Sequence, residues 1–162
     1  MPSNTTVCKC LQSNKTPQNR LKKVNQLSAI EAASFFESNP DALYVDVRTV
    51  AEFALGHPKL RCVNIPMLFR YPTTDKTLQN DAFSLVAGHA LSETDELIVG
   101  SERNARARQA YKMLEDSGFS KIRLLIDGHL GWMKSGMPTT GDNRDGVSYA
   151  SLLTGARRTK KK

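Results

Sequence analysis

The sequence lacks an apolar run long enough to cross a membrane. Its longest apolar runs, at residues 97–100 and 122–126, fall far short of the roughly 20 residues that span a bilayer. The first 23 residues also lack the apolar core of a secretory signal. We therefore expect a protein that has no membrane segment, is not secreted and resides in the cytoplasm.

Cysteine and aromatic residues are also scarce. The 162 residues include three cysteines, Cys8, Cys10 and Cys62, and this odd number argues against a disulfide framework and favours a reducing compartment. Aromatic residues make up 7% of the chain, which together with abundant Val, Leu and Ile suffices for one core and excludes wholesale disorder. The length predicts a single domain, and we expect a monomer.

Acidic residues are missing from both ends of the chain. Residues 1–23 carry five Lys or Arg and residues 156–162 carry five more, so the net charge of +7 leaves −3 for residues 24–155. We interpret 1–23 as a disordered basic N-terminal arm, 24–140 as the folded domain and 141–162 as a flexible basic C-terminal tail. Besides simple solvation, two alternatives stay open: nucleic-acid binding or nuclear localisation through the tail, and mitochondrial or other organelle targeting through the arm.

Between these ends, short β-rich runs alternate with helical patterns. Strands are predicted at residues 24–27, 42–47, 62–65, 96–100 and 121–125. Helices are predicted at residues 29–37, 49–56, 82–90 and 103–116, and residues 75–80 are interpreted as a loop. Ser28 with Glu31, and Thr49 with Glu52, have the spacing of capping boxes. The alternation predicts an α/β fold with a five-stranded parallel sheet, helices on both faces and a site at the carboxyl ends of the strands.

Three segments resemble the rhodanese (sulfurtransferase) domain family. The first has a D-V-R, E-F, G-H, N-I-P pattern between Asp46 and Pro66. The second, residues 101–119, is a loop that opens a helix ending in L-x-x-x-G-F. The third, from Gly128 to Pro138, has the pattern G-x-x-x-W-x-x-x-G-x-P. The resemblance covers residues 24–138 and implies a rhodanese-like fold, in agreement with the predicted strands and helices.

The loop departs from the family pattern at the residue that carries the chemistry. The resemblance implies a C-x-x-G-x-R loop whose Cys accepts a sulfane sulfur as a persulfide and passes it on. Matching the loop Arg to Arg106 places Ser101 at the Cys, Asn104 at the Gly and Ala107 at the Ser that usually follows. Asn adopts a left-handed backbone more readily than most residues, so we expect the loop to keep its shape. The loop from Ser101 to Arg106 is shorter than the loop of the related phosphatases and arsenate reductases, which argues against membership of that branch.

We expect this loop to hold an anion without catalysing sulfur transfer. Backbone N–H groups and the start of the following helix favour an anion, but a serine hydroxyl gains little nucleophilicity there and oxygen cannot carry a persulfide. Asp46 and Arg48 are expected to support the loop, with Arg48 paired to Asp46 or Glu52 in a structural role. The predicted site residues are Ser101, Glu102, Arg103, Asn104, Ala105 and Arg106, with Asp46 and Arg48 in support.

Two functions remain open. One is a catalytically inactive module that binds a sulfane-sulfur donor, another small anion or a protein partner through the loop. The other is a thiosulfate or persulfide sulfurtransferase whose catalytic Cys is replaced by Ser101, either naturally or by engineering. Asn104, Ala107 and Asp127, the last in place of the first Gly of a Gly-Gly pair, favour natural change.

The remaining candidate residues are expected to be structural. Cys62 lies in an apolar run and is expected in the core, and His57 follows a helix end. Cys8 and Cys10 form a C-x-C pair, but two sulfurs do not make a zinc site and the histidines lie in separate elements. We expect no metal and no cofactor, and nucleic acid only at the basic ends.

Overall fold

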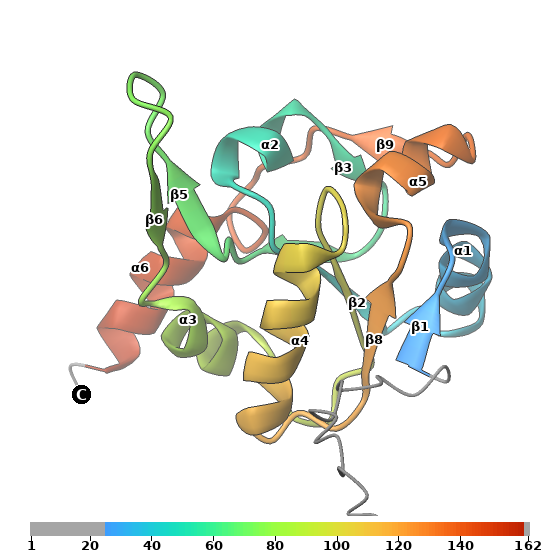
Figure 1. Ribbon diagram of the computed structural model, residues 1–162. Coiled ribbons are helices and arrows are strands. Elements are labelled where there is room, and N and C mark those ends of the chain that lie inside the picture. The colour runs from blue at the N-terminus through green and yellow to red at the C-terminus, as the bar shows by residue number, and fades with distance from the viewer. Residues whose placement is uncertain (1–24, 161–162) are drawn as a thin grey trace, which may run out of the picture.

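The computed structural model of the chain describes residues 25–160, which form one main sheet wrapped by helices (Figure 1). The basic arm predicted for residues 1–23 lies outside the described residues. In chain order the elements are β1 (Gln26–Leu27), α1 (Ala29–Ser38), β2 (Leu43–Asp46), α2 (Val50–Leu55), β3 (His57–Pro58), β4 (Cys62–Asn64), β5 (Leu68–Arg70), β6 (Thr77–Gln79), α3 (Phe83–Ala90), β7 (Leu97–Gly100), α4 (Ala105–Asp116), β8 (Ile122–Leu125), α5 (Gly128–Lys134), β9 (Thr139–Thr140) and α6 (Tyr149–Thr159).

The main sheet has five parallel strands in the order β1-β8-β7-β2-β4. They coincide with the five strands expected from the sequence, which confirms the predicted sheet. The central strand β2 pairs with β7 on one side and β4 on the other, and Asp46 at its end lies level with Gly100 and Asn64. The carboxyl ends of three neighbouring strands therefore meet at one edge, where open parallel sheets carry their sites.

Alternate side chains of the strands enter two hydrophobic clusters, one on each face of the sheet. Val45 and Val99 pack in the cluster that includes buried residues of α3, α4 and α6. Tyr44 and Ile98 pack in the cluster that includes buried residues of α1 and α5 and Phe53 of α2. Side chains of successive strand residues point to opposite faces, so a strand buried on both faces is apolar throughout. The two-layered helical cover confirms the predicted α/β architecture.

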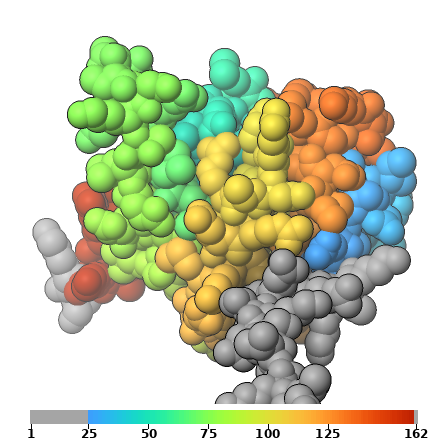
Figure 2. Space-filling model, viewed as in Figure 1, coloured from blue at the N-terminus to red at the C-terminus, as the bar shows by residue number. Residues whose placement is uncertain are grey.

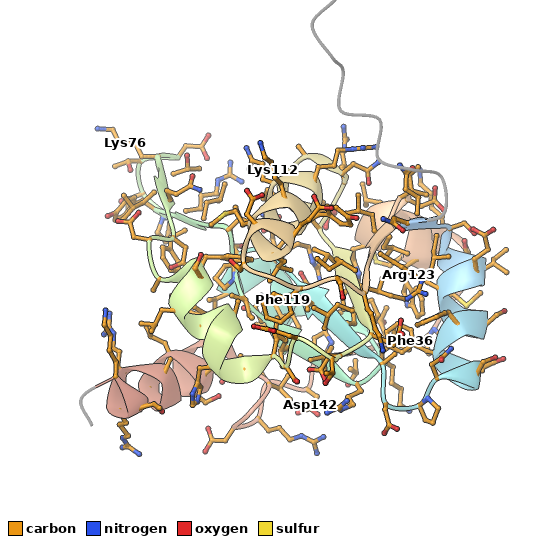
Figure 3. All side chains as sticks on the ribbon, turned by 90° about the horizontal axis from the view of Figure 1, so that it is seen from below. Phe36, Lys76, Lys112, Phe119, Arg123 and Asp142 are labelled. Atoms are coloured by element: carbon orange, nitrogen blue, oxygen red, sulfur yellow. The ribbon has the colours of Figure 1, made fainter. Side chains whose placement is uncertain are left out.

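Two small antiparallel sheets lie outside the main one. β3 pairs with β9, and β5 pairs with β6. β6 falls within residues 75–80, which the sequence prediction assigned to a loop, and all three of its residues are exposed, so no apolar alternation marks it. The β5–β6 hairpin projects from the body of the molecule (Figure 2), and Lys76 at its tip points outward (Figure 3).

Part of the segment that was predicted to be a flexible tail, residues 149–159, is a packed helix in the structure. Within it α6 packs against α3, and Tyr149, Leu152 and Ala156 on one face of α6 are buried. The Tyr149 hydroxyl also donates a hydrogen bond to Asn80 Oδ1 at 2.9 Å. The spacing of the three buried residues forms an apolar stripe along a helix, and this stripe outweighs the basic composition on which the prediction rested.

Candidate functional site

A buried ion pair closes the carboxyl end of β2. Asp46 is 0% exposed and Arg48 2% exposed. Arg48 donates from Nε to Asp46 Oδ1 at 3.0 Å and from Nη2 to Asp46 Oδ2 at 2.8 Å, and Nη2 also donates to the Gly56 carbonyl oxygen at 2.8 Å. Burial acts to lower the pKa of Arg48, but the hydrogen bonds and charge of Asp46 leave it raised. Arg48 thus ties the end of β2 to the end of α2, in the structural role expected for it.

A second ion pair joins the start of α2 to the start of α4. Arg106 donates two hydrogen bonds to the carboxylate of Glu52, at 2.6 and 2.8 Å. Glu52 also accepts from the backbone N–H and the hydroxyl of Thr49, which completes the expected capping box. Burial acts to raise the pKa of Glu52, but the hydrogen bonds from Arg106 and Thr49 lower it to about 2. The family's loop arginine therefore has a carboxylate of its own chain as partner.

Ser101 lies directly after β7 and is only 1% exposed. Its hydroxyl donates a hydrogen bond to the carbonyl oxygen of Arg103, and its own carbonyl accepts from the backbone N–H of His129 at 2.8 Å. Gly128 has φ +63°, and a Cβ on it would lie 2.5 Å from the Glu102 carbonyl oxygen. The loop is therefore seated on the start of α5 through a contact that only glycine permits.

Asn104 does not adopt the left-handed backbone expected from the sequence. Its φ is −98° and its ψ −22°, which is the right-handed helical region. α4 begins at Ala105, later than the predicted start at Arg103. The expected loop shape relied on a residue with positive φ at position 104, whereas in the structure the close packing on Gly128 and the bond from Ser101 to Arg103 fix the turn.

The structure brings the remaining loop residues and the supporting pair together at one edge of the sheet. Arg103 and Ala105 are exposed, and Glu102, Asn104 and Arg106 are partly buried. Glu102 reaches the supporting pair, with its Oε2 3.4 Å from Arg48 Nη1. Sequence reasoning did not assign Glu52 as the partner of Arg106, because the contact spans 54 positions, although Glu52 stood within the quoted pattern.

His129 is a second residue of this edge that sequence reasoning did not assign to the site. It is 4% exposed, and its Nδ1 is buried without a hydrogen-bond partner among the described residues. Burial, and then the charge of Arg48, lower the pKa of His129, which favours the neutral ring. His129 lines a cavity of about 340 Å³ beside the loop together with Arg48 and Glu102.

Cys62 and His57 form a buried pair on β4 and β3. Cys62 Sγ lies 3.4 Å from His57 Nδ1, and His57 Nε2 lies 2.8 Å from the Asp142 carbonyl oxygen. The His57 ring stacks on Phe53 with ring centroids 3.8 Å apart. Burial, and then the charge of Asp46, raise the pKa of Cys62 to about 12. Both residues therefore have the structural surroundings that the sequence predicted for them.

Residues 25–160 offer no group of three or more His, Cys, Asp or Glu side chains that could hold a metal ion. Cys8 and Cys10 lie outside the described residues. Within the described part of the chain no helix has the length and apolar character needed to cross a membrane.

Comparison with known proteins agrees with the family resemblance seen in the sequence. The rhodanese-like domain family matches residues 28–135. Thiosulfate sulfurtransferase 18 of Arabidopsis thaliana is 30% identical over 103 residues, 63% of this chain and 74% of that protein. Thiosulfate sulfurtransferase 16, chloroplastic, of the same plant is 31% identical over 59% of this chain and 78% of that protein. Rhodanese-like domain-containing protein 15, chloroplastic, is 30% identical, but the match spans only 50% of its length.

Solved structures show the same architecture. The Alr3790 protein from Anabaena sp. has a TM-score of 0.59 at 18% identity, over 84% of this chain and 94% of that one. Rv0390 from M. tuberculosis also has a TM-score of 0.59, at 21% identity, over 72% of this chain and 97% of that one. At these identities the likeness concerns the fold alone.

Proposed function

We propose that this chain, which belongs to the rhodanese-like domain family, is a catalytically inactive member of it. Its loop from Ser101 to Arg106 binds a small anion or a protein partner. One observation carries the proposal. Ser101 lies at the position where the family resemblance implies a nucleophilic cysteine. Its side chain is buried, with the residue 1% exposed, and its hydroxyl donates a hydrogen bond to the Arg103 carbonyl oxygen.

Sulfur transfer needs a group that Ser101 does not supply. In transfer from thiosulfate, a thiolate attacks the outer sulfur, a new sulfur–sulfur bond forms, the sulfur–sulfur bond of thiosulfate breaks and sulfite leaves. A serine hydroxyl is protonated at neutral pH and becomes a nucleophile only beside a base. Ser101 instead donates to a carbonyl oxygen, which takes no proton, and His129 contacts Ser101 through its backbone N–H and not through its ring.

Cys62 is poorly suited to replace the missing nucleophile. It is 7% exposed, and a thiol whose pKa is about 12 stays protonated at neutral pH. It lies on β4, on the face of the sheet that α1 and α5 cover, and it belongs to a hydrophobic cluster there. These properties support a packing role.

Binding is supported by the charges around the start of α4. Arg103 and Arg108 are exposed there, and a helix N-terminus presents backbone N–H groups that favour negative charge. Arg48 and Arg106 contribute less, because each is paired with a carboxylate of the chain. We therefore infer weak anion binding, which a partner with an acidic segment strengthens through additional contacts.

A second function, a sulfurtransferase in which Ser101 stands in for the catalytic Cys, has specific support. The Asp46–Arg48 and Glu52–Arg106 pairs keep the loop anchored to the sheet, so the frame around the nucleophile position is intact. Two relatives are named thiosulfate sulfurtransferases. Under this interpretation Ser101 is the replacement that removes the activity.

Mass spectrometry after incubation with thiosulfate tests the first proposal. The intact chain is compared with a variant carrying Cys8→Ser and Cys10→Ser, which removes both thiols of the arm. We expect the variant to gain no sulfur atom, because Cys62 is its last thiol and is protonated. A gain of one sulfur on Cys62, located by peptide mapping and followed by its loss to cyanide, would overturn the proposal.

A further inference from the structure

The cavity beside the loop combines buried polar groups with an exposed apolar rim. Arg48 and His129 are 2% and 4% exposed, whereas Leu55 and Met133, which line the same cavity, are 91% and 45% exposed. Glu102 lines it as well, and its side chain is 34% exposed. The volume of about 340 Å³ falls in the range of small-molecule sites.

One nitrogen of the Arg48 guanidinium, Nη1, makes only a long hydrogen bond at this cavity. Nε and Nη2 are occupied by Asp46 and by the Gly56 carbonyl oxygen. Nη1 has one loose contact, Glu102 Oε2 at 3.4 Å, which is longer than the roughly 2.7–2.9 Å of a good charge-assisted hydrogen bond. A carboxylate of the chain therefore already lies next to this donor, without a tight bond to it.

His129 supplies a second, independent observation. Its Nδ1 is buried and has no partner among the described residues, whereas most buried side-chain polar atoms in folded proteins have one. In its neutral form, which burial favours, the ring has one N–H donor and one acceptor nitrogen. Because this nitrogen is buried, a polar ligand in the cavity would give it a partner only through a shift of the ring on binding.

We propose that this cavity binds a small organic anion, a carboxylate or sulfonate that carries an apolar group. The anion takes the Nη1 donor of Arg48 in place of the Glu102 carboxylate, the His129 ring hydrogen-bonds to it, and its apolar group lies against Leu55 and Met133. Glu102 is thus an internal competitor that keeps affinity low. The inference rests on the proposed function, because it treats this edge of the sheet as a binding site.

Isothermal titration with benzenesulfonate tests the assignment on the full chain. The Glu102→Gln variant keeps the size of the side chain but removes the competing charge. We expect it to bind benzenesulfonate about tenfold more tightly than the unaltered chain, because one carboxylate no longer shares the cation with the ligand. The matched control Glu115→Gln, at an exposed position on α4, should bind as the unaltered chain does.

Two further variants assign the two ends of the ligand. In the Glu102→Gln background, Leu55→Ala should weaken benzenesulfonate several-fold and leave inorganic sulfate unchanged, and His129→Gln should weaken both. The inference is wrong if Glu102→Gln binds no more tightly than Glu115→Gln while both are folded by circular dichroism. Sulfur transfer by the unaltered chain would contradict the proposed function but not this binding result, so the two failures are distinguishable.

Discussion

Each of the two central arginines at the edge of the sheet is partnered within the chain. Arg48 is held by Asp46, and Arg106 by Glu52, through charge-assisted hydrogen bonds of 2.6 to 3.1 Å. Such pairs anchor the loop, but they neutralise positive charge that would otherwise attract a bound anion. The edge is therefore built for rigidity more than for strong anion capture, in keeping with a loop that has no thiol.

The Glu52 carboxyl makes stability depend on acid pH. Its folded pKa of about 2 lies below its ordinary value of 4.5, so it stabilises the fold above pH 4.5 and loses that contribution as pH falls towards 2. After discounting for partial exposure, we expect the loss to be about 1–2 kcal/mol. Urea unfolding at pH 6 and pH 2.5 should show a larger drop for the unaltered chain than for Glu52→Gln.

The exposed Glu115→Gln replacement is the control for this measurement. It removes one carboxylate from α4 without touching the Arg106 pair. The account of Glu52 fails if Glu52→Gln and Glu115→Gln lose the same free energy of unfolding between the two pH values.

At the residue scale, local patterns predicted local contacts. The Thr49–Glu52 box joins residues three positions apart and was predicted, and Asp46, two positions from Arg48, was one of the two partners predicted for that arginine. The Glu52–Arg106 pair spans 54 positions and depends on how α2 and α4 meet above the sheet. His129 Nδ1, which has no hydrogen-bond partner among the described residues, also depends on tertiary packing and has no signal in the sequence.

At the scale of elements, the seating of the loop on α5 depends on Gly128. Its φ of +63° and the 2.5 Å approach of an added Cβ to the Glu102 carbonyl oxygen leave no room for alanine. We expect Gly128→Ala to lower the free energy of unfolding by more than about 2 kcal/mol. Gly88→Ala, at an exposed position of α3 where an added Cβ has no atom within 4 Å, should instead stabilise by up to about 1 kcal/mol.

Thermal and urea unfolding of the two alanine variants measure this difference. Equal effects of Gly128→Ala and Gly88→Ala would show that the loop tolerates movement away from α5. The seating of the loop would then not be a fixed feature of the fold.

α6 should contribute to stability as a packed element. Leu152 is 8% exposed and lies in the larger hydrophobic cluster. We expect Leu152→Ala to lower the free energy of unfolding by about 2–3 kcal/mol, whereas Leu55→Ala, at a residue 91% exposed, should change it by less than about 0.5 kcal/mol. Urea denaturation gives both values, and a Leu152 effect as small as that of Leu55 would restore the interpretation of the segment as a tail.

Elements with a strong periodic signal were predicted and the others were not. Four of the five main-sheet strands, β2, β4, β7 and β8, are short and rich in apolar residues, which is why the sequence marked them. β6 is exposed throughout and left no such mark. The apolar stripe of α6 has three positions among many basic and small residues. The helix was therefore not predicted from the composition of this segment.

At the scale of the whole molecule, the fold rests mainly on hydrophobic packing that does not include residue 101. Two hydrophobic clusters, one on each face of the parallel sheet, hold the helices in place. The loop hydroxyl contributes one hydrogen bond to this structure. We therefore expect a replacement at position 101 to leave the rhodanese-like fold in place, as the proposed inactive role of the loop requires.

The measurement that tests the central claim most directly is thiosulfate-to-cyanide sulfur transfer by the unaltered chain and by Ser101→Cys. The account predicts no turnover by the unaltered chain above a blank without protein, because position 101 carries no thiolate. Turnover by Ser101→Cys alone would identify Ser101 as the single lesion, and silence of both folded proteins would show that the loop has lost more than its thiol. Turnover by the unaltered chain would contradict the account.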